Sequence, residues 1–297
     1  MKKILLIKGV SQYDAMRIYI DEYAKGLQNE NVDTIIIDAK EDNFTEDLIR
    51  YATSGEIDWV FTCNGIMMED EFYNNIFRQN NISKCTFLYD HPIYHSQRLC
   101  LNIILDEYEF ERTDSEFHYM LIMLNKADKY IREYFREKMI KTVLESDIIL
   151  NVHGNGWTNF PSNKKSNLII REGYGDEALK SLLQTKISLN IMPWFRGGFQ
   201  ERIASAMLSG AISLTDTSDY IEDKFIKGNN IVIYSLKDLD NLPNIITDLL
   251  SNPEKAKIIA QNGYEEALKK HTWHHRIKDV LQSIKEFEVN LIADSNS

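Results

Sequence analysis

Residues 186–216 read KISLNIMPWFRGGFQERIASAMLSGAISLTD, and this stretch decides the fold. An apolar run, a glycine turn, a mixed segment and a second apolar run follow one another, which is typical of a strand, a helix and another strand. Helical spacing places four apolar side chains of the mixed segment on one face, toward the sheet: Phe199, Ile203, Ala206 and Met207. Gly210 suits the left-handed position that ends a helix, so the stretch predicts a βαβ unit.

The turn before this helix is a candidate anion site. Gly197 and Gly198 would let backbone amides approach a ligand at the helix N-terminus, where the helix dipole favours a phosphate. In α/β sheets, nucleotides bind where a parallel strand leads into such a turn. An ordinary crossover without any ligand is the alternative interpretation of this pattern.

The composition describes a globular chain of 297 residues, with 43% hydrophobic and 27% charged residues. A formal charge of −11 argues against a nucleic-acid partner, although it is compatible with a local basic pocket. Cys63, Cys85 and Cys100 lack metal-ligand spacing and are expected to be reduced core cysteines. No apolar stretch has the length of a signal peptide or a transmembrane segment, so a cytoplasmic location is expected.

The first part of the sequence alternates short apolar runs with amphipathic segments. This alternation predicts a doubly wound parallel sheet. We expect strands at 4–7, 34–37, 57–62 and 85–89, and helices at 13–28, 45–53 and 69–79. Thr45 is the expected cap of the second helix.

The alternation of apolar runs and amphipathic segments is absent from residues 98–145, and a second α/β region follows them. A buried stripe is expected at Met120, Met123 and Leu124, and a charged helix at 131–144 would lead into the second domain. Further strands are expected at 147–152, 167–170, 187–191, 212–214 and 231–234. The predicted domains are 1–140, 141–280, and a terminal helix end and tail at 281–297. Both main domains are expected to be Rossmann-like.

Several short motifs occur in one order between residues 146 and 280. They are Leu189-Asn190, Glu201-Arg202, the run from Ala206 to Ala211, Thr215-Asp216, Asp219-Tyr220, Phe225, Gly228, the strand from Ile231 to Tyr234, and His271-Thr272-Trp273 with Arg276. This segment resembles the C-terminal half of the glycosyl transferases group 1 family, in its spore-maturation (CgeB-like) branch. The resemblance implies a GT-B fold, in which two Rossmann-like domains face each other across a cleft.

The resemblance also implies a glycosyltransferase that takes a nucleotide sugar as co-substrate, with UDP or GDP as the expected nucleotide, and needs no cofactor. Arginine binds diphosphate in a bidentate fork, so Arg196 and Arg202 are the candidate cations. Arg196 could equally be an idle surface residue, and Arg202 is favoured because it matches the Glu-Arg pair of the family. Glu201 could bind a donor hydroxyl or orient Arg202. The predicted donor-binding set is Gly154, Gly156, Asn190, Arg196, Gly197, Gly198, Phe199, Glu201, Arg202 and Ser205.

One departure from the family concerns the ribose of the donor. Many relatives carry two glutamates eight positions apart, and the corresponding residues here are Gly197 and Ser205. Ser205 could donate one hydrogen bond to a ribose hydroxyl but cannot form a charged pair. Either Glu201 replaces the second glutamate, or the donor is bound more weakly.

Candidate catalytic residues follow two strands of the first domain. Asp90 and His91 come after the fourth expected strand, where the family often shows Asp-x-Pro, and Asp14 follows the first. Histidine, with a reference pKa of about 6.5, could act as a general base, as could an aspartate. The alternative is that Asp90 caps a turn and His91 packs against Pro92. No Asp-x-Asp pair lies where a metal-dependent transferase holds its cation, so metal-independent catalysis is expected.

Two further functions are compatible with these residues. The missing glutamate pair could mark a catalytically silent subunit that binds a nucleotide sugar for a partner enzyme. A nucleotide-sugar epimerase could use the same architecture. The sequence leaves open the acceptor, the oligomeric state, and whether the anomeric configuration is retained or inverted.

Overall fold

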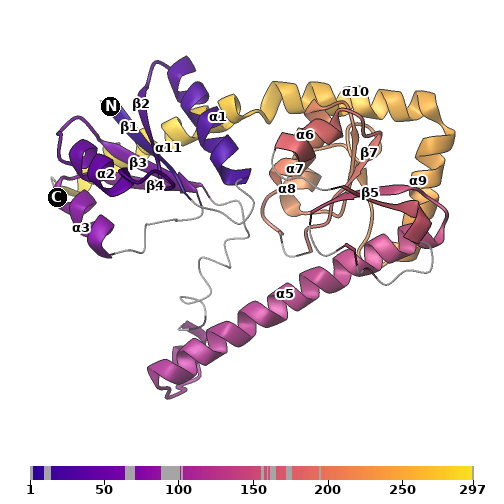
Figure 1. Cartoon of the computed structure of the whole chain (residues 1–297), viewed down its shortest axis with the longest axis horizontal. Helices are drawn as coiled ribbons and strands as arrows, with labels where there is room; N and C mark the ends of the chain where they lie inside the picture. Colours follow the sequence, from indigo (N-terminus) through magenta and orange to yellow (C-terminus); the bar gives the residue numbers. More distant parts are fainter. Residues whose placement is uncertain are drawn as a thin grey trace. The chain divides into compact units, whose positions relative to one another are not determined.

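The computed structural model describes residues 3–9, 15–63, 71–87, 101, 103–154, 157–158, 160, 165–171, 176–193 and 195–295. The chain divides into two compact units, drawn in Figure 1. The first unit combines Met1–Tyr89 with Leu268–Ser297, and the second is Asp90–Ala267. The last helix packs with the first sheet and belongs to the first unit. The domain ranges 1–140, 141–280 and 281–297 stay a prediction.

The first unit is a parallel sheet with helices on both faces, as the alternation of runs predicted. Its strands are β1 (Lys3–Lys8), β2 (Asp33–Asp38), β3 (Trp59–Cys63) and β4 (Ser83–Phe87), in the order β2-β1-β3-β4. Its first three helices are α1 (Ala15–Asn29), α2 (Phe44–Ala52) and α3 (Glu71–Gln79).

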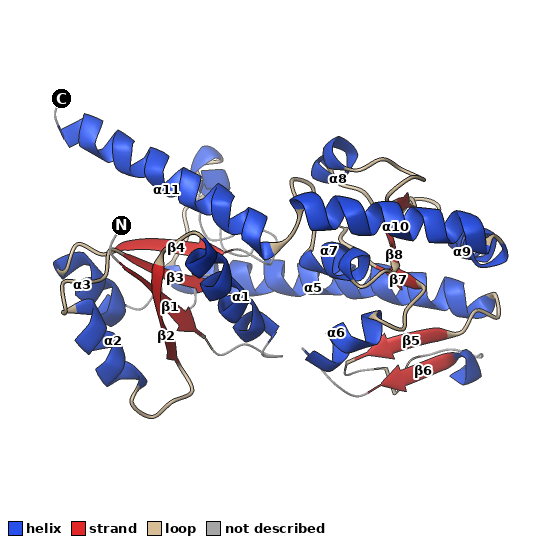
Figure 2. Cartoon of the chain, turned by 90° about the horizontal axis from the view of Figure 1, so that it is seen from above, coloured by secondary structure: helices blue, strands red, loops and turns tan. Residues whose placement is uncertain are grey.

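Alternate side chains of β1 enter two different cores, as the pleat of a strand requires. Ile4 and Leu6 pack with α1 on one face, whereas Leu5 and Ile7 pack with α2 and α3 on the other. Figure 2 shows the sheet between these two layers. The buried side chains of β1 are therefore all apolar, and those of β3 are apolar except for Thr62.

The start of α2 differs from the prediction. The helix begins at Phe44, and Asn43 is at the N-cap position without a side-chain cap hydrogen bond. Thr45, the predicted cap, is inside the first turn. Phe44 is buried in the core of the first unit, so packing rather than capping sets where this helix begins.

Helix α11 (Trp273–Ser295) belongs to the first unit. The Trp273 ring lies 5.1 Å from the rings of both Tyr19 and Tyr23 on α1. Ile277 is fully buried against the same helix, beside Gly26. Trp273, from the His-Thr-Trp motif, therefore packs the terminal helix against α1.

The second unit contains two parallel sheets that share one core. Strands β5 (Leu150–His153) and β6 (Leu168–Arg171) form one sheet, and β7 (Ile187–Leu189), β8 (Ile212–Thr215) and β9 (Val232–Ile233) form the other. The surrounding helices are α6 (Asp176–Leu182), α7 (Glu201–Leu208), α8 (Asp219–Lys224), α9 (Leu242–Ser251) and α10 (Pro253–Lys270). The expected βαβ unit is therefore confirmed as β7, α7 and β8, with Gly210 at φ 79° after the helix.

Helix α5 (Asp114–Glu145) is much longer than the predicted 131–144. It begins with a capping box between Thr113 and Glu116, which the sequence analysis missed. The expected buried stripe is wrong, because Met123 and Leu124 are 46% and 43% exposed and only the last turns of α5 reach the core. No helix in the described ranges combines the length and apolarity needed to span a membrane.

The contact between α1 and α11 gives a stability prediction. Glycine to alanine inside a helix normally stabilises it by about 1 kcal/mol. At Gly26 the new Cβ would lie 2.9 Å from Ile277 Cγ1, so Gly26→Ala should instead lower the free energy of unfolding by about 1–3 kcal/mol. Denaturant unfolding of the purified chain measures the change.

The neighbouring exposed Lys25→Ala is the matched control and should change stability by less than about 0.5 kcal/mol. Adding Ile277→Ala to Gly26→Ala should cost less than the sum of the two single changes, because the clash is removed. A stabilising Gly26→Ala would contradict the packing of α11 on α1.

Candidate functional site

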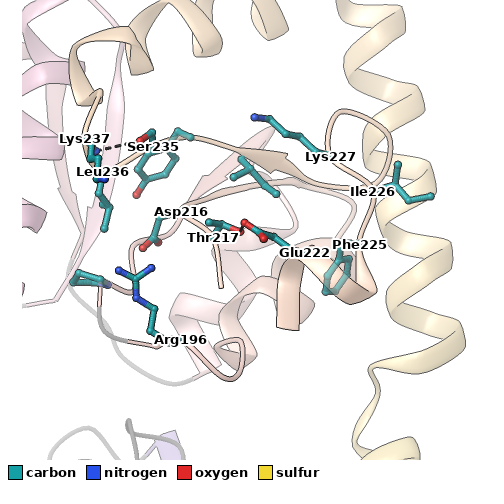
Figure 3. Close-up of a pocket in the computed structure, with 13 residues that line it drawn as sticks. Arg196, Asp216, Thr217, Glu222, Phe225, Ile226, Lys227, Ser235, Leu236 and Lys237 are labelled. Carbon is teal, nitrogen blue, oxygen red and sulfur yellow. Dashed lines mark hydrogen bonds between the residues drawn. The ribbon is translucent and has the colours of Figure 1, made fainter. Parts of the chain in front are cut away.

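A cavity of about 850 Å³ opens at the edge of the second sheet where β7, β8 and β9 end (Figure 3). The three strands are parallel, so their carboxyl ends meet there, which is the edge where open α/β sheets bind ligands. The volume is in the range of small-molecule sites. The cavity is lined by Pro193, Arg196, Asp216, Thr217, Glu222, Phe225, Ile226, Lys227, Ile233, Tyr234, Ser235, Leu236 and Lys237.

Hydrogen bonds join the ends of the three strands. The Met192 amide donates to Asp216 Oδ1 at 2.8 Å, and the Asn190 side-chain amide donates to Thr215 Oγ1 at 3.0 Å. The Tyr234 hydroxyl donates to the Asn190 carbonyl at 2.7 Å. The segments after β7, β8 and β9 are therefore held at fixed distances from one another, which gives the cavity a defined wall.

Asp216 is the buried titratable group of this cavity. The residue is 3% exposed, and burial raises the pKa of its carboxyl to about 6, although the Met192 amide and Arg196 favour the charged form. Burial and the nearby Asp216 carboxylate raise the pKa of Tyr234, so the tyrosine keeps its proton. Asp216 is thus a carboxyl that titrates close to neutral pH at the wall of the cavity.

Arg196 lies on a loop that is attached to the start of α8. The Asp219 amide donates to the Arg196 carbonyl at 2.9 Å, and the Ser218 hydroxyl donates to the Gly198 carbonyl. Gly198 cannot be replaced without a rearrangement, since a Cβ there would lie 2.7 Å from the Phe195 ring. Figure 3 shows the guanidinium of Arg196 directed toward the Asp216 carboxylate.

The other charged side chains that line the cavity include both cations and an anion. Lys227 and Lys237 are exposed cations that line the cavity across from Arg196 (Figure 3). Glu222 is an exposed carboxylate that accepts a hydrogen bond from Thr217 Oγ1 at 3.1 Å. Cations of this kind can neutralise a diphosphate, and carboxylates and hydroxyls can bind sugar hydroxyls. The cavity can therefore hold a ligand that combines a diphosphate with sugar hydroxyls.

The structure brings together only part of the predicted donor-binding set. Arg196 lines the cavity, Asn190 belongs to the hydrogen bonds behind it, and Gly197 and Gly198 are on the same loop. Phe199 comes before α7 rather than on it, and its ring stacks on Tyr220 at 5.1 Å.

Three other predicted residues are on α7 outside the described lining of the cavity. Arg202 is exposed and donates to the Gln200 side chain, whereas Glu201 and Ser205 are half-buried. Gly154 follows β5, with φ 107°. The predicted residues Gly156, Asp14, Asp90 and His91 fall outside the described residues.

Four residues of the cavity were not predicted from the sequence: Asp216, Thr217, Lys227 and Lys237. Thr215-Asp216 had served only as a motif, although a polar pair directly after a buried strand is a signal for the ligand-binding edge. The two lysines are in loops after α8 and β9, where nothing in a single sequence separates a ligand contact from a solvated surface lysine.

In the described parts of the chain, no three histidine, cysteine, aspartate or glutamate side chains gather as metal ligands would. Burial raises the pKa of Cys63 to about 12 and that of Cys85 to about 11, which disfavours the reactive thiolate. The prediction of a core cysteine is confirmed for Cys63, whereas Cys85 is partly buried against the same core.

Solved structures with low sequence identity share the fold of the whole chain. HepE from Anabaena, in complex with UDP-glucose, is 12% identical, with 95% of this chain and 99% of that chain covered and a TM-score of 0.59. Sucrose-phosphate synthase from Thermosynechococcus elongatus is 12% identical (98% and 100% covered, TM-score 0.63). A glycosyltransferase from Rickettsia africae ESF-5 is 11% identical (96% and 98% covered, TM-score 0.57).

These likenesses confirm the GT-B fold that the sequence predicted. No curated protein matches the sequence significantly. The family model described as glycosyl transferase-like matches residues 132–282, just over half of the chain, and includes every residue of the cavity. The chain therefore belongs to the glycosyl transferase-like family and is a glycosyltransferase with a GT-B fold.

Proposed function

We propose that this glycosyltransferase transfers a sugar from a UDP- or GDP-activated donor, and that the second unit binds the donor. The observation that carries the proposal is the cavity at the ends of β7, β8 and β9, where Arg196 faces the buried Asp216. The HepE structure contains UDP-glucose at a similar fold, which supports a nucleotide sugar as the ligand class. The acceptor is a glycan, a protein or a small molecule.

The diphosphate is assigned to Arg196 and the backbone of Gly197 and Gly198. This loop leads into α7, whose N-terminus has a partial positive charge, and Lys237 is a second cation on the opposite side of the cavity. Arg202, the second residue of α7, is the alternative cation. Since Ser205 is outside the cavity lining, Asp216 and Thr217 are the groups we assign to a donor hydroxyl.

The first unit is assigned to the acceptor. Of the proposed bases, Asp14 follows β1 in the sequence, and Asp90 and His91 follow β4, at the border where the range of the second unit begins. The segments after parallel strands are where α/β folds gather reactive groups. The predicted boundary between the two domains at residue 140 and the cytoplasmic location stay predictions. So does the spore-maturation branch of the family.

Catalysis is proposed to need no metal ion. The positive charge that a departing nucleoside diphosphate requires can come from Arg196, Lys227 and Lys237, together with the N-terminus of α7. Preorganised cations and amide dipoles stabilise such a leaving group without reorganisation during the reaction.

The donor assignment predicts how Arg196→Ala changes binding. Loss of a charge-assisted contact should weaken UDP binding by about 1.5–3 kcal/mol, roughly 10- to 150-fold, and leave uridine binding unchanged. Titration calorimetry with UDP, GDP and their nucleosides measures both effects and identifies the base.

Arg50→Ala, at an exposed position of α2, is the control and should bind UDP like the wild type. Arg202→Ala decides between the two candidate cations. If Arg202→Ala loses UDP affinity and Arg196→Ala does not, the diphosphate is bound at α7 and not in the cavity. If the wild type binds neither nucleotide, the donor assignment fails.

The metal-free mechanism predicts that EDTA leaves the rate of sugar transfer unchanged, because protein cations supply the positive charge. Donor hydrolysis by the purified chain is a suitable assay while the acceptor is unidentified. A rate that falls sharply in EDTA and recovers when magnesium or manganese is added would contradict the metal-free mechanism.

The raised pKa of Asp216 predicts that the stability of the folded chain depends on pH in an unusual direction. Its carboxyl has a pKa of about 6 in the folded chain against an ordinary 3.8, so the folded chain holds a proton that the unfolded chain has lost between these values, and stability falls as the pH rises from about 3.8 to about 6. Asp216→Asn keeps an oxygen for the Met192 amide and should be up to about 3 kcal/mol more stable than the wild type at pH 7.5. The difference should vanish near pH 4.

Denaturant unfolding at both pH values tests this, with the exposed Asp223→Asn as control. The same Asp216→Asn variant should lose donor turnover, because a residue kept at a cost in stability serves function. An Asp216→Asn variant that is less stable than the wild type at pH 7.5 would show that the carboxylate is net stabilising.

A further inference from the structure

The first half of α5 contains an apolar run whose side chains are not buried. The run from Tyr119 to Leu124 reads YMLIML, yet no side chain from residue 118 to 138 is buried in this fully described segment. Figure 1 shows this part of α5 extending beyond the sheets of the second unit. An apolar helix surface of this extent normally marks an interaction site.

The exposed side chains form one face. Spacings of three and four residues place Tyr119, Ile122, Met123, Tyr130 and Tyr134 along the same side of the helix. They are between 39% and 68% exposed, with Tyr130 the most exposed. At about 150–250 Å² per aromatic side chain, this face and its neighbours offer roughly several hundred Å², the order that one partner of a stable dimer buries.

The charges on either side of this face are opposite. Residues 106–116 contain six acidic side chains and one basic, whereas residues 126–141 contain six basic and three acidic. The acidic end surrounds a hollow of about 890 Å³, lined by Asp106, Glu109, Glu111 and Asp114 among others. Its one cation, Arg112, is already bound to Asp106 at 2.8 Å.

We propose that two copies of the chain pair through α5, antiparallel, about a two-fold axis close to Ile122 and Met123. The apolar run lies midway between the acidic and the basic segment, so this arrangement places each acidic end against the basic segment of the other copy. A parallel pair would bring like charges together. An anionic lipid surface would be repelled by the acidic end.

The interface follows the rules of an isologous contact, in which the same patch serves both partners. Apolar side chains at the centre exclude water, and the charged ends set the direction of pairing and reject the parallel arrangement. The assembly is a homodimer that needs no other protein.

The test is the mass of the full chain in solution, measured by light scattering or sedimentation over a wide range of concentrations. The wild type should have twice the chain mass of 34.7 kDa, and Ile122→Glu with Met123→Glu should have the single mass. Glutamate is a good helix former, so α5 should stay helical in circular dichroism. Ile258→Glu, at a 60% exposed position of α10, is the matched control and should remain dimeric.

Charge reversal tests the direction of pairing. Lys126→Glu with Lys129→Glu should dissociate the dimer at low salt, where the wild type stays paired, because acidic side chains then face the acidic end of the other copy. Adding Glu111→Lys with Asp114→Lys should restore the dimer. A wild type that is monomeric at every concentration overturns the proposal, whether the face then binds lipid vesicles or packs against the chain's own first unit. A dimer that survives both apolar and charge substitutions also overturns it.

Discussion

The hydrogen bond from the Met192 amide to the buried Asp216 carboxylate is the contact on which the candidate site depends. It fixes the loop after β7 to the end of β8, and Tyr234 adds the end of β9 through the Asn190 carbonyl. Because the bond holds a carboxylate that burial disfavours, the cavity has a group that titrates near neutral pH at the place where a charged ligand would bind. Donor binding, the pH dependence of stability and the orientation of Arg196 are therefore connected through one side chain.

Strands and the central βαβ unit could be predicted because burial on both faces makes their sequences continuously apolar. Val60 and Phe61 enter opposite cores of the first unit, and Ile212 and Leu214 are buried in the second, so each signal is local. The start of α2 was missed because Phe44 packs in the core and overrides the cap. The length of α5 was missed because its first half contacts no core, so apolar periodicity alone gave the wrong burial for Met123 and Leu124.

The candidate site could be located from the sequence but not completed. The glycines and the start of α7 identify the loop of Arg196 in the sequence, since both signals depend on the conformation of neighbouring residues alone. Asp216, Lys227 and Lys237 join that loop only through the parallel order of β7, β8 and β9, which is a long-range property. The packing of Ile277 against Gly26 could not be predicted for the same reason, because it joins segments at opposite ends of the chain.

The central claim is that a nucleotide sugar binds at the ends of β7, β8 and β9. Amide hydrogen exchange with and without UDP-glucose, or the GDP-sugar if calorimetry selects that base, tests it most directly, because protection reports the backbone that the ligand orders. We expect the strongest slowing in residues 190–200 and 216–237. Slowing confined to residues 1–89, with no change in 190–237, would contradict the account.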